Sequence, residues 1–125
     1  MGIINTFFYD TYALYEIIEG NPNYKIYTKN VGMIITKLNL MELYYGLLIK
    51  YDKKIAEKYY NELLIYTAEF NDETLKKAMQ FKAMNKKKKL SYIDCLGYVK
   101  ALEMGIKFLT GDIQFRDIPN VEYVK

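Results

Sequence analysis

Short apolar runs alternate with helical patterns along the first third of the chain. Residues 3–9 are apolar, with aromatic and β-branched side chains, and the run ends at Asp10, which predicts a buried strand. Apolar positions then recur at helical spacing until the Gly-Asn-Pro sequence at 20–22, where we expect that helix to stop. Residues 24–30 fit either a helix or a loop, and residues 31–35 predict a second buried strand.

Helical periodicity dominates the middle of the chain. Leucine and tyrosine side chains recur at helical spacing between positions 40 and 48, and a second such pattern covers about residues 53–64. Residues 65–69 fit a short strand. A third helix is predicted from Asn71 to about residue 84, because acidic residues just after Asn71 favour a helix start.

The last third returns to alternating elements. Ser91 is expected to open a helix that Gly105 ends. Strands are predicted at 106–110 and at 121–124, with a loop over 111–120 between them. Strands that alternate with helices predict an α/β fold, with a mainly parallel sheet covered by helices on both faces.

Composition narrows the class of protein. A length of 125 residues predicts one domain, residues 1–125, and a 51% hydrophobic fraction is that of a folded chain rather than a disordered one. No segment is long enough to span a bilayer, and residues 1–8 lack the basic start of a signal peptide. We therefore expect a cytoplasmic protein without membrane contact.

The residue types that are missing exclude several kinds of chemistry. The chain has no histidine, which removes Ser–His–Asp and Cys–His catalysis, histidine metal sites and RNA cleavage by a histidine pair. The one cysteine, Cys95, allows no intrachain disulfide and argues against a thiolate zinc site. Cys95 lies in an apolar helical stretch and is expected to be a buried hydrophobe.

Four acidic residues are predicted to lie near one edge of the sheet: Asp10, Glu42, Asp94 and Asp112. Asp10 follows the first strand, and Glu42 lies early in the helix after the second. From Asp94 the helix climbs roughly 15 Å at about 1.5 Å per residue. The next strand returns about 16 Å at roughly 3.3 Å per residue, so Asp112 comes back to the level of Asp94. Ligand sites of open α/β sheets lie at this edge.

Carboxylates brought together repel one another, and a hard cation such as Mg²⁺ or Mn²⁺ offsets that repulsion. The ion would activate water and neutralise phosphate oxygens, which makes phosphodiester hydrolysis the leading hypothesis. Each acid has a structural alternative. Asp10 fits a helix N-cap, Glu42 a solvated helix residue, Asp94 a capping box with Ser91, and Asp112 a turn residue.

The ordered set of motifs resembles the PIN-domain family, and its compact length resembles the VapC-type toxin branch. The matching residues are Asp10-Thr11, Glu42 with Gly46, Asp94 before an apolar helix, and Thr110-Gly111-Asp112 with Phe115. The resemblance covers nearly the whole chain. It implies a three-layer α/β/α sandwich and an endoribonuclease that uses Mg²⁺ or Mn²⁺.

The resemblance also implies roles for single residues and for partners. Asp10, Glu42, Asp94 and Asp112 would form the catalytic metal site, with Thr11 and Thr110 as supporting polar residues and Asp117 in an outer shell. Metal-activated water would attack phosphorus and leave a 5′-phosphate and a 3′-hydroxyl. The expected partners are an RNA substrate, a cognate antitoxin protein and a second copy of the chain in a homodimer.

Positive charge is concentrated in one short segment. The net charge is +3, but without the five lysines between 82 and 89 the chain has 13 basic residues against 15 acidic ones. Such a segment suits an RNA backbone, although a solvated helix end is an equal alternative. The predicted RNA-binding residues are Lys82, Lys86, Lys87, Lys88 and Lys89.

Two other classes of function stay open at this stage. A signalling receiver domain is also α/β and of similar size, but it needs a pair of acids after the first strand, and Asp10 follows Tyr9 instead. A PIN-like module that binds RNA or protein without cleaving would keep the fold and lose turnover. Carboxylate-dependent binding of Mn²⁺ separates that module from a nuclease.

Overall fold

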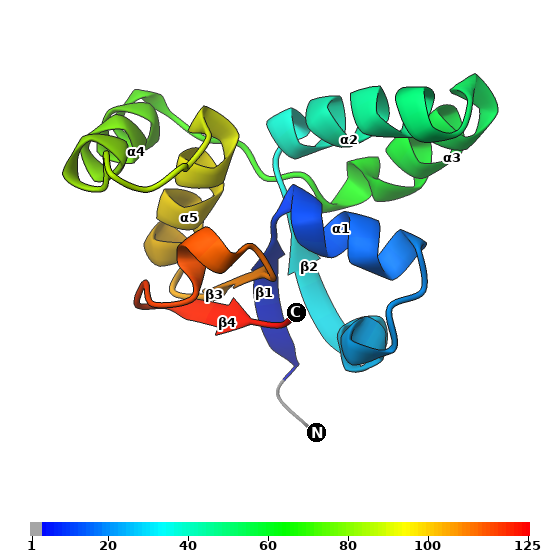
Figure 1. Cartoon of the computed structure of the whole chain (residues 1–125), viewed down its shortest axis with the longest axis horizontal. Coiled ribbons are helices and arrows are strands. Elements are labelled where there is room, and N and C mark those ends of the chain that lie inside the picture. Colours follow the sequence, from blue (N-terminus) through cyan, green and yellow to red (C-terminus); the bar gives the residue numbers. More distant parts are fainter. Residues whose placement is uncertain (1–3) are drawn as a thin grey trace.

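A parallel four-stranded sheet forms the centre of the molecule in this computed structural model, which describes residues 4–125 (Figure 1). The strands lie in the order β2-β1-β3-β4, and all three pairings are parallel. Their bounds are β1 (Asn5–Tyr9), β2 (Val31–Ile34), β3 (Lys107–Thr110) and β4 (Val121–Tyr123). The helices are α1 (Thr11–Ile18), α2 (Lys37–Lys50), α3 (Lys53–Leu63), α4 (Asp72–Met84) and α5 (Tyr92–Met104). The described residues also form three 3₁₀ turns: η1 (Pro22–Tyr27), η2 (Leu64–Tyr66) and η3 (Ile113–Phe115).

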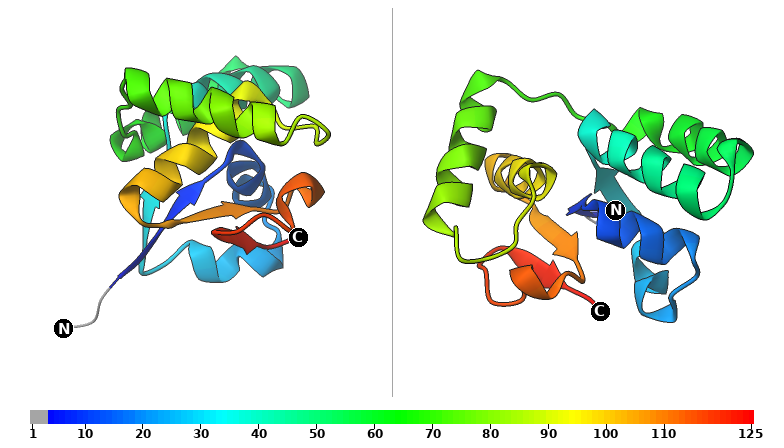
Figure 2. Two further views of the ribbon diagram at one scale, coloured as in Figure 1. Left: turned by 90° about the vertical axis from the view of Figure 1, so that its left-hand side faces the viewer. Right: turned by 45° about the horizontal axis from the view of Figure 1, so that its top comes forward.

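Side chains that alternate along β1 and β3 divide the core into two halves. Phe8 and Phe108 point to one face, where α4 and α5 pack against them. Tyr9 and Leu109 point to the other face, which α1, α2, α3 and η1 cover. The two groups of helices flank the sheet in Figures 1 and 2. The predicted three-layer α/β/α sandwich with a parallel sheet is therefore confirmed.

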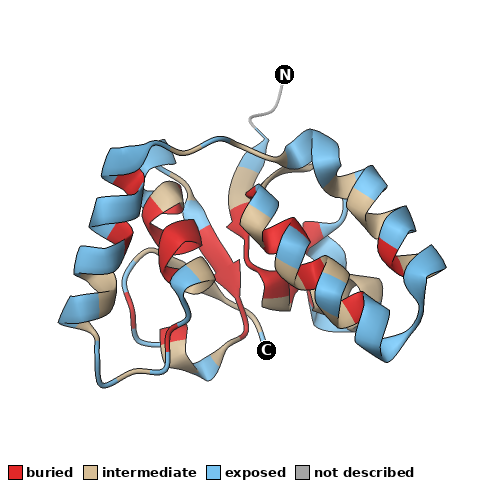
Figure 3. Ribbon diagram, turned by 90° about the horizontal axis from the view of Figure 1, so that it is seen from above, coloured by how far each residue is buried: buried red, intermediate tan, exposed pale blue. Residues whose placement is uncertain are grey.

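Burial follows the layers (Figure 3). The middle of α5 is buried because it lies between the sheet and α4, whereas α4 buries only Thr74 and Ala78. Cys95 has no exposed surface, as expected for a small apolar residue. Between residues 4 and 125 no helix combines the length and the apolar character needed to cross a membrane.

The predicted helices and strands are confirmed except at 65–69. The start of the first strand, the segment 24–30 and the loop 111–120, which contains η3, also differ from the prediction. The first strand begins at Asn5, and Ile3 lies outside the described residues. The segment that fitted either a helix or a loop is largely the 3₁₀ turn η1, which Asn21 caps. The short strand predicted at 65–69 is wrong, because only an isolated parallel bridge joins Thr67 to Ile35 beside β2. Residues 64–66 form η2 instead and leave no room for a longer pairing.

The packing of α5 on the sheet depends on a close approach at Gly97. A Cβ atom placed there would lie 2.6 Å from Cε1 of Phe8 and 3.1 Å from Cε1 of Phe108. These two rings stack with centroids 5.8 Å apart in the centre of the core. Because both rings are fully buried in a close-packed core, a larger residue at 97 would push α5 away from the strands.

We therefore expect Gly97→Ala to lower the free energy of unfolding by about 1–3 kcal/mol, the usual cost of overpacking. Alanine favours helices over glycine by about 1 kcal/mol, so a net decrease would show that steric conflict dominates. Urea unfolding measures the change. In a Phe8→Leu background the same substitution should cost less, and an equal cost in both backgrounds would contradict this account of the packing.

Candidate functional site

Asp10 occupies the end of the interior strand β1, where the chain turns into α1. Its side chain is only 3% exposed. Its Oδ1 accepts a hydrogen bond of 2.9 Å from the N–H of Ala13, so Asp10 is the N-cap of α1. Its own N–H donates to the carbonyl of Leu109 on β3 at 3.1 Å. The cap and the sheet together fix this carboxyl group.

Thr110 joins Asp10 to Asp112 across the end of the sheet. The Thr110 hydroxyl accepts a hydrogen bond of 3.0 Å from the N–H of Asp112, and it also bonds to the Asp10 carboxylate. Thr110 is fully buried at the end of β3, next to β1. Thr110 therefore lies beside Asp10, and the supporting role predicted for it stays a prediction.

The glycine of the Thr110-Gly111-Asp112 sequence has a steric reason. A Cβ atom at Gly111 would lie 2.3 Å from the carbonyl oxygen of Val124 and 2.4 Å from Cε1 of Tyr12. The close approach of a backbone atom leaves no room for a side chain at this turn. Glycine therefore allows the chain to turn between Thr110, at the buried end of β3, and Asp112.

Asp94 and Asp112 each cap a helical element. Asp94 and Ser91 form a capping box at the start of α5, with the Ser91 N–H donating to Asp94 Oδ2 at 3.0 Å. Asp112 caps η3, because its Oδ1 accepts from the N–H of Gln114 at 2.9 Å. The structural alternatives from the sequence thus apply to Asp10, Asp94 and Asp112. Each cap occupies only one carboxylate oxygen of each residue.

The acids influence one another electrostatically. Burial raises the pKa of Asp10 to about 8; hydrogen bonds from Thr110 and Ala13 lower it, and the charges of Asp94 and Asp112 raise it further. Burial also raises the pKa of Asp94, hydrogen bonds with Ser91 lower it, and the charges of Glu42 and Asp112 raise it. These charges link the four acids, which we call the acidic edge.

The acidic edge offers the type of ligand that a hard divalent cation takes, but its side chains are not spaced to surround one ion. Oxygen ligands from carboxylates are what Mg²⁺ and Mn²⁺ take. Within residues 4–125, however, no three Asp, Glu or Cys side chains lie close enough to surround one ion. Mutual repulsion favours such separation in the absence of a cation. The placement supports the predicted residues, whose metal-binding role stays a prediction.

A buried polar network beside Asp10 was missed by the sequence analysis. Asn39 is 1% exposed, and its Oδ1 accepts hydrogen bonds of 2.9 Å from both the N–H and the hydroxyl of Thr36. Its Nδ2 donates to the Thr11 hydroxyl at 3.3 Å. Thr11 thus lies next to Asp10 in a buried network, and the supporting role predicted for it stays a prediction. The signal was Asn39 three residues after Thr36, which is the spacing of a capping box.

Two of the predicted site residues, Asp117 and Lys82, make other contacts: Asp117 is exposed beside Arg116, and Lys82 bonds within the fold. The Asp117 side chain is 79% exposed and lies 3.9 Å from Nε of Arg116. Lys82 donates from its ammonium group to the carbonyl of Leu90 and lies over the ring of Tyr92. Lys82 therefore fastens α4 to the segment before α5, and its charge is partly used within the fold.

Lys86, Lys87, Lys88 and Lys89 form the segment between α4 and α5, which we call the basic turn. Lys86, Lys87 and Lys89 are exposed, and Lys88 is half-buried. The N–H of Lys89 donates to Oε1 of Gln114 at 3.1 Å. Because Gln114 follows Asp112 by two residues, the basic turn lies beside the acidic edge, as the sequence predicted.

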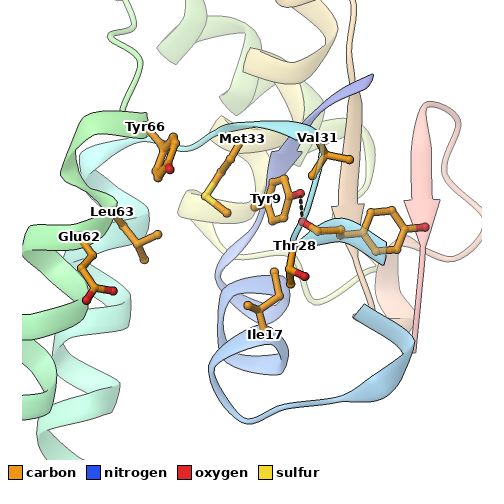
Figure 4. A pocket seen from close by; sticks show the side chains of 9 residues that line it. Tyr9, Ile17, Thr28, Val31, Met33, Glu62, Leu63 and Tyr66 are labelled. Carbon is orange, nitrogen blue, oxygen red and sulfur yellow. Dashed lines mark hydrogen bonds between the residues drawn. The ribbon is translucent and has the colours of Figure 1, made fainter. Parts of the chain in front are cut away.

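A separate cavity of about 270 Å³ opens on the α1 and α2 face of the sheet (Figure 4). Side chains from the end of α3 and from η2 stand across it from residues of α1, η1 and β2 (Figure 4). Its lining residues are Tyr9, Ile17, Tyr27, Thr28, Val31, Met33, Glu62, Leu63 and Tyr66. Glu62 is its only acid, so this cavity is distinct from the acidic edge.

Known structures share this arrangement of elements. The toxin VapC20 of Mycobacterium tuberculosis, a Sarcin-Ricin loop cleaving toxin, superimposes with a TM-score of 0.79 at 14% identity over 95% of this chain and 99% of its own. A toxin–antitoxin complex from Klebsiella pneumoniae gives a TM-score of 0.73 at 16% identity, covering 92% and 94%. VapBC-1 from nontypeable Haemophilus influenzae gives 0.72 at 13% identity, covering 94% and 96%. Identities this low show a shared fold.

Comparison with curated proteins found no match. The family model for the PIN domain, in contrast, matches residues 7–121. That match includes the end of β1, the helices of both faces and the whole acidic edge. The resemblance seen in the sequence is thereby confirmed, and the chain belongs to the PIN-domain family.

Proposed function

We propose that this protein is an endoribonuclease that depends on Mg²⁺ or Mn²⁺ and serves as the toxin of a toxin–antitoxin pair. The observation that carries the proposal is the buried carboxyl group of Asp10, whose pKa is raised to about 8 by burial and by two neighbouring acids. A carboxylate in such a place is stabilised by a bound cation. Perturbed carboxyl groups of this kind cluster at functional sites.

The ligands of the ion would be Asp10, Glu42, Asp94 and Asp112, each with an oxygen that no cap uses. The ion would supply a Lewis acid that makes water easier to deprotonate and neutralises phosphate charge. Thr110 orients the Asp10 carboxylate through its hydroxyl. Thr11, held by Asn39, keeps a polar group beside Asp10. Asp117, exposed beside Arg116, would act at most in an outer shell.

RNA would reach the acidic edge over the basic turn. Lysine side chains bind phosphates without reading sequence, and the basic turn carries four of them beside Gln114 and Asp112. Three of these lysines are exposed. The arrangement supports binding of a single-stranded backbone with its scissile phosphate at the carboxylates.

Partner proteins would cover the exposed apolar side chains of α2 and η2. Met41, Tyr45, Ile49 and Ile65 are all more than half exposed. Apolar surface of this kind favours protein contacts. The structures of similar fold include VapBC-1 from nontypeable Haemophilus influenzae and, from Klebsiella pneumoniae, a complex of a toxin with its antitoxin, which supports a partner of that kind. An antitoxin and a second copy of this chain are the proposed partners.

A catalytically inactive PIN-like module that binds RNA or protein is the second candidate. It is favoured by the spacing of the acids, which within residues 4–125 are not gathered closely enough to surround an ion. It is also favoured by the use of three of them as caps. A module of this kind would bind RNA through the basic turn without turnover.

Substitution of the acids tests the nuclease. Asp10→Asn and Asp94→Asn keep an oxygen for each cap but remove a charge, so Mg²⁺-dependent cleavage should fall by about 100-fold or more. A fluorescent single-stranded RNA, cleaved under single-turnover conditions, measures the rate.

Asp52→Asn is the matched control for these variants. Asp52 caps α3 in the same way, because its Oδ1 accepts from the N–H of Ile55 at 2.9 Å. Its variant should retain full activity. Equal cleavage by Asp10→Asn, Asp94→Asn and the unaltered chain would reject the assignment of the acids.

The raised pKa of Asp10 predicts how stability depends on pH. Its carboxyl group titrates near 8 in the folded protein against an ordinary value of 3.8. Between these values the folded state holds a proton that the unfolded state releases, so stability falls as pH rises from about 4 to 8. Asp10→Asn removes this dependence, and its melting temperature should fall less between pH 5 and pH 8.

The same melting experiment tests binding of the ion. Mn²⁺ should raise the melting temperature of the unaltered chain by several degrees at pH 8. The increase should be much smaller at pH 5, because the Asp10 carboxyl group is then protonated. It should do little to Asp10→Asn at either pH. Equal pH profiles for the two proteins, or equal effects of Mn²⁺, would refute the role given to Asp10.

A further inference from the structure

Gln114 connects the basic turn to the acidic edge through two hydrogen bonds. Its side-chain Oε1 accepts from the N–H of Lys89 at 3.1 Å. Its own N–H donates to Oδ1 of Asp112 at 2.9 Å. One residue therefore contacts a lysine of the basic turn with its side chain and a carboxylate of the acidic edge with its backbone.

Gln114 itself is held firmly. It lies in η3, between the cap at Asp112 and the fully buried ring of Phe115. The N–H of Phe115 also donates to the carbonyl of Asp112 at 2.9 Å. The side chain of Gln114 is thus attached to a fixed part of the core and acts as a rigid support.

The basic turn is anchored at both ends and needs a support in between. At its start Asn85 caps α4, and the Asn85 carbonyl accepts a bond of 2.9 Å from the N–H of Lys88. At its end Leu90 is 3% exposed, and its carbonyl accepts from Lys82. Four like charges repel one another, so the segment between these anchors favours separation and spreading. The bond to Gln114 opposes that spreading on the side of the acidic edge.

We propose that Gln114 is a positioning residue that holds the basic turn beside the acidic edge, so that its lysines contact phosphates next to the scissile one. The proposal rests on the proposed function, which supplies the RNA substrate. It differs from the roles of the acids, because Gln114 acts on substrate only through the lysines. Removal of its side-chain amide should weaken RNA binding and leave the carboxylates intact.

The test uses the full chain and a fluorescent, unstructured single-stranded RNA of about 12 nucleotides, long enough to span a site of several phosphates and bound in EDTA so that no cleavage occurs. Gln114→Met keeps the length of the side chain and removes the acceptor. Affinity measured by fluorescence anisotropy should fall about three- to tenfold, the range of one hydrogen bond. The slope of log affinity against log salt should become shallower by about 0.7 for each phosphate that the lysines no longer neutralise.

Two further proteins make the test specific. Gln80→Met, on the exposed surface of α4, is the matched control and should bind as the unaltered chain does. A second background replaces all four lysines of the basic turn by glutamine. There Gln114→Met should weaken binding no further, because its effect passes through those lysines. An equal decrease in both backgrounds, or no decrease in either, would overturn the proposal.

Amide hydrogen exchange separates this proposal from the proposed function. Gln114→Met should speed exchange of the N–H groups in residues 86–89 and leave that of α4 unchanged. Unchanged exchange in the basic turn would overturn the positioning role, whatever the RNA result. Failure of the unaltered chain to bind RNA, with faster exchange in the variant, would instead reject the RNA-binding function.

Discussion

The cost of ionising Asp10 at the buried end of the interior strand governs the rest of this structure. A carboxylate away from water is stable only with hydrogen bonds and an opposite charge. The protein supplies the hydrogen bonds, from Ala13 and from Thr110, but the nearest charges that act on it are the like charges of Asp94 and Asp112. Within the part of the chain that the structure describes, the Asp10 carboxylate therefore has hydrogen bonds but no opposite charge, which a bound cation would supply.

Helix caps hold three of the acids near this end of the sheet. Asp10 is the N-cap of α1 and Asp112 is the N-cap of η3. Asp94 lies in the first turn of α5 and closes the capping box with Ser91, so each of the three acids is fixed by the backbone at a helix start. A cap and a metal ligand are compatible roles, because a carboxylate has two oxygens. The caps therefore fix where three of the acids lie, although within residues 4–125 the carboxylates are not close enough together to surround one ion.

The sequence predicted the strands, the helices and the acids that follow them, because these depend on local apolar periodicity and capping signals. Those signals are short-range, which is why Thr110 and Asp94 could be placed correctly from their neighbours alone. The strand predicted at 65–69 is only an isolated bridge at Thr67, because the turn η2 just before Thr67 limits the pairing beside β2.

What the sequence could not predict are contacts between segments distant along the chain. Asn39 lies 28 residues from Thr11, and Gln114 lies 25 residues from Lys89. The capping-box spacing marks Asn39 as a partner of Thr36. Nothing in the local pattern indicates its contact with Thr11 or the contact of Gln114 with Lys89. The hydrogen bond from Lys82 to the backbone carbonyl of Leu90 could not be predicted for the same reason.

Calorimetric titration of the full chain with Mn²⁺ at pH 7, in two buffers of different ionisation enthalpy, tests the central claim most directly. Asp10 has a pKa of about 8, so an ion bound by its carboxylate must displace a proton. The account predicts saturable binding with release of about one proton, and the disappearance of both in Asp10→Asn. Absence of binding, or a binding enthalpy independent of buffer, would contradict it.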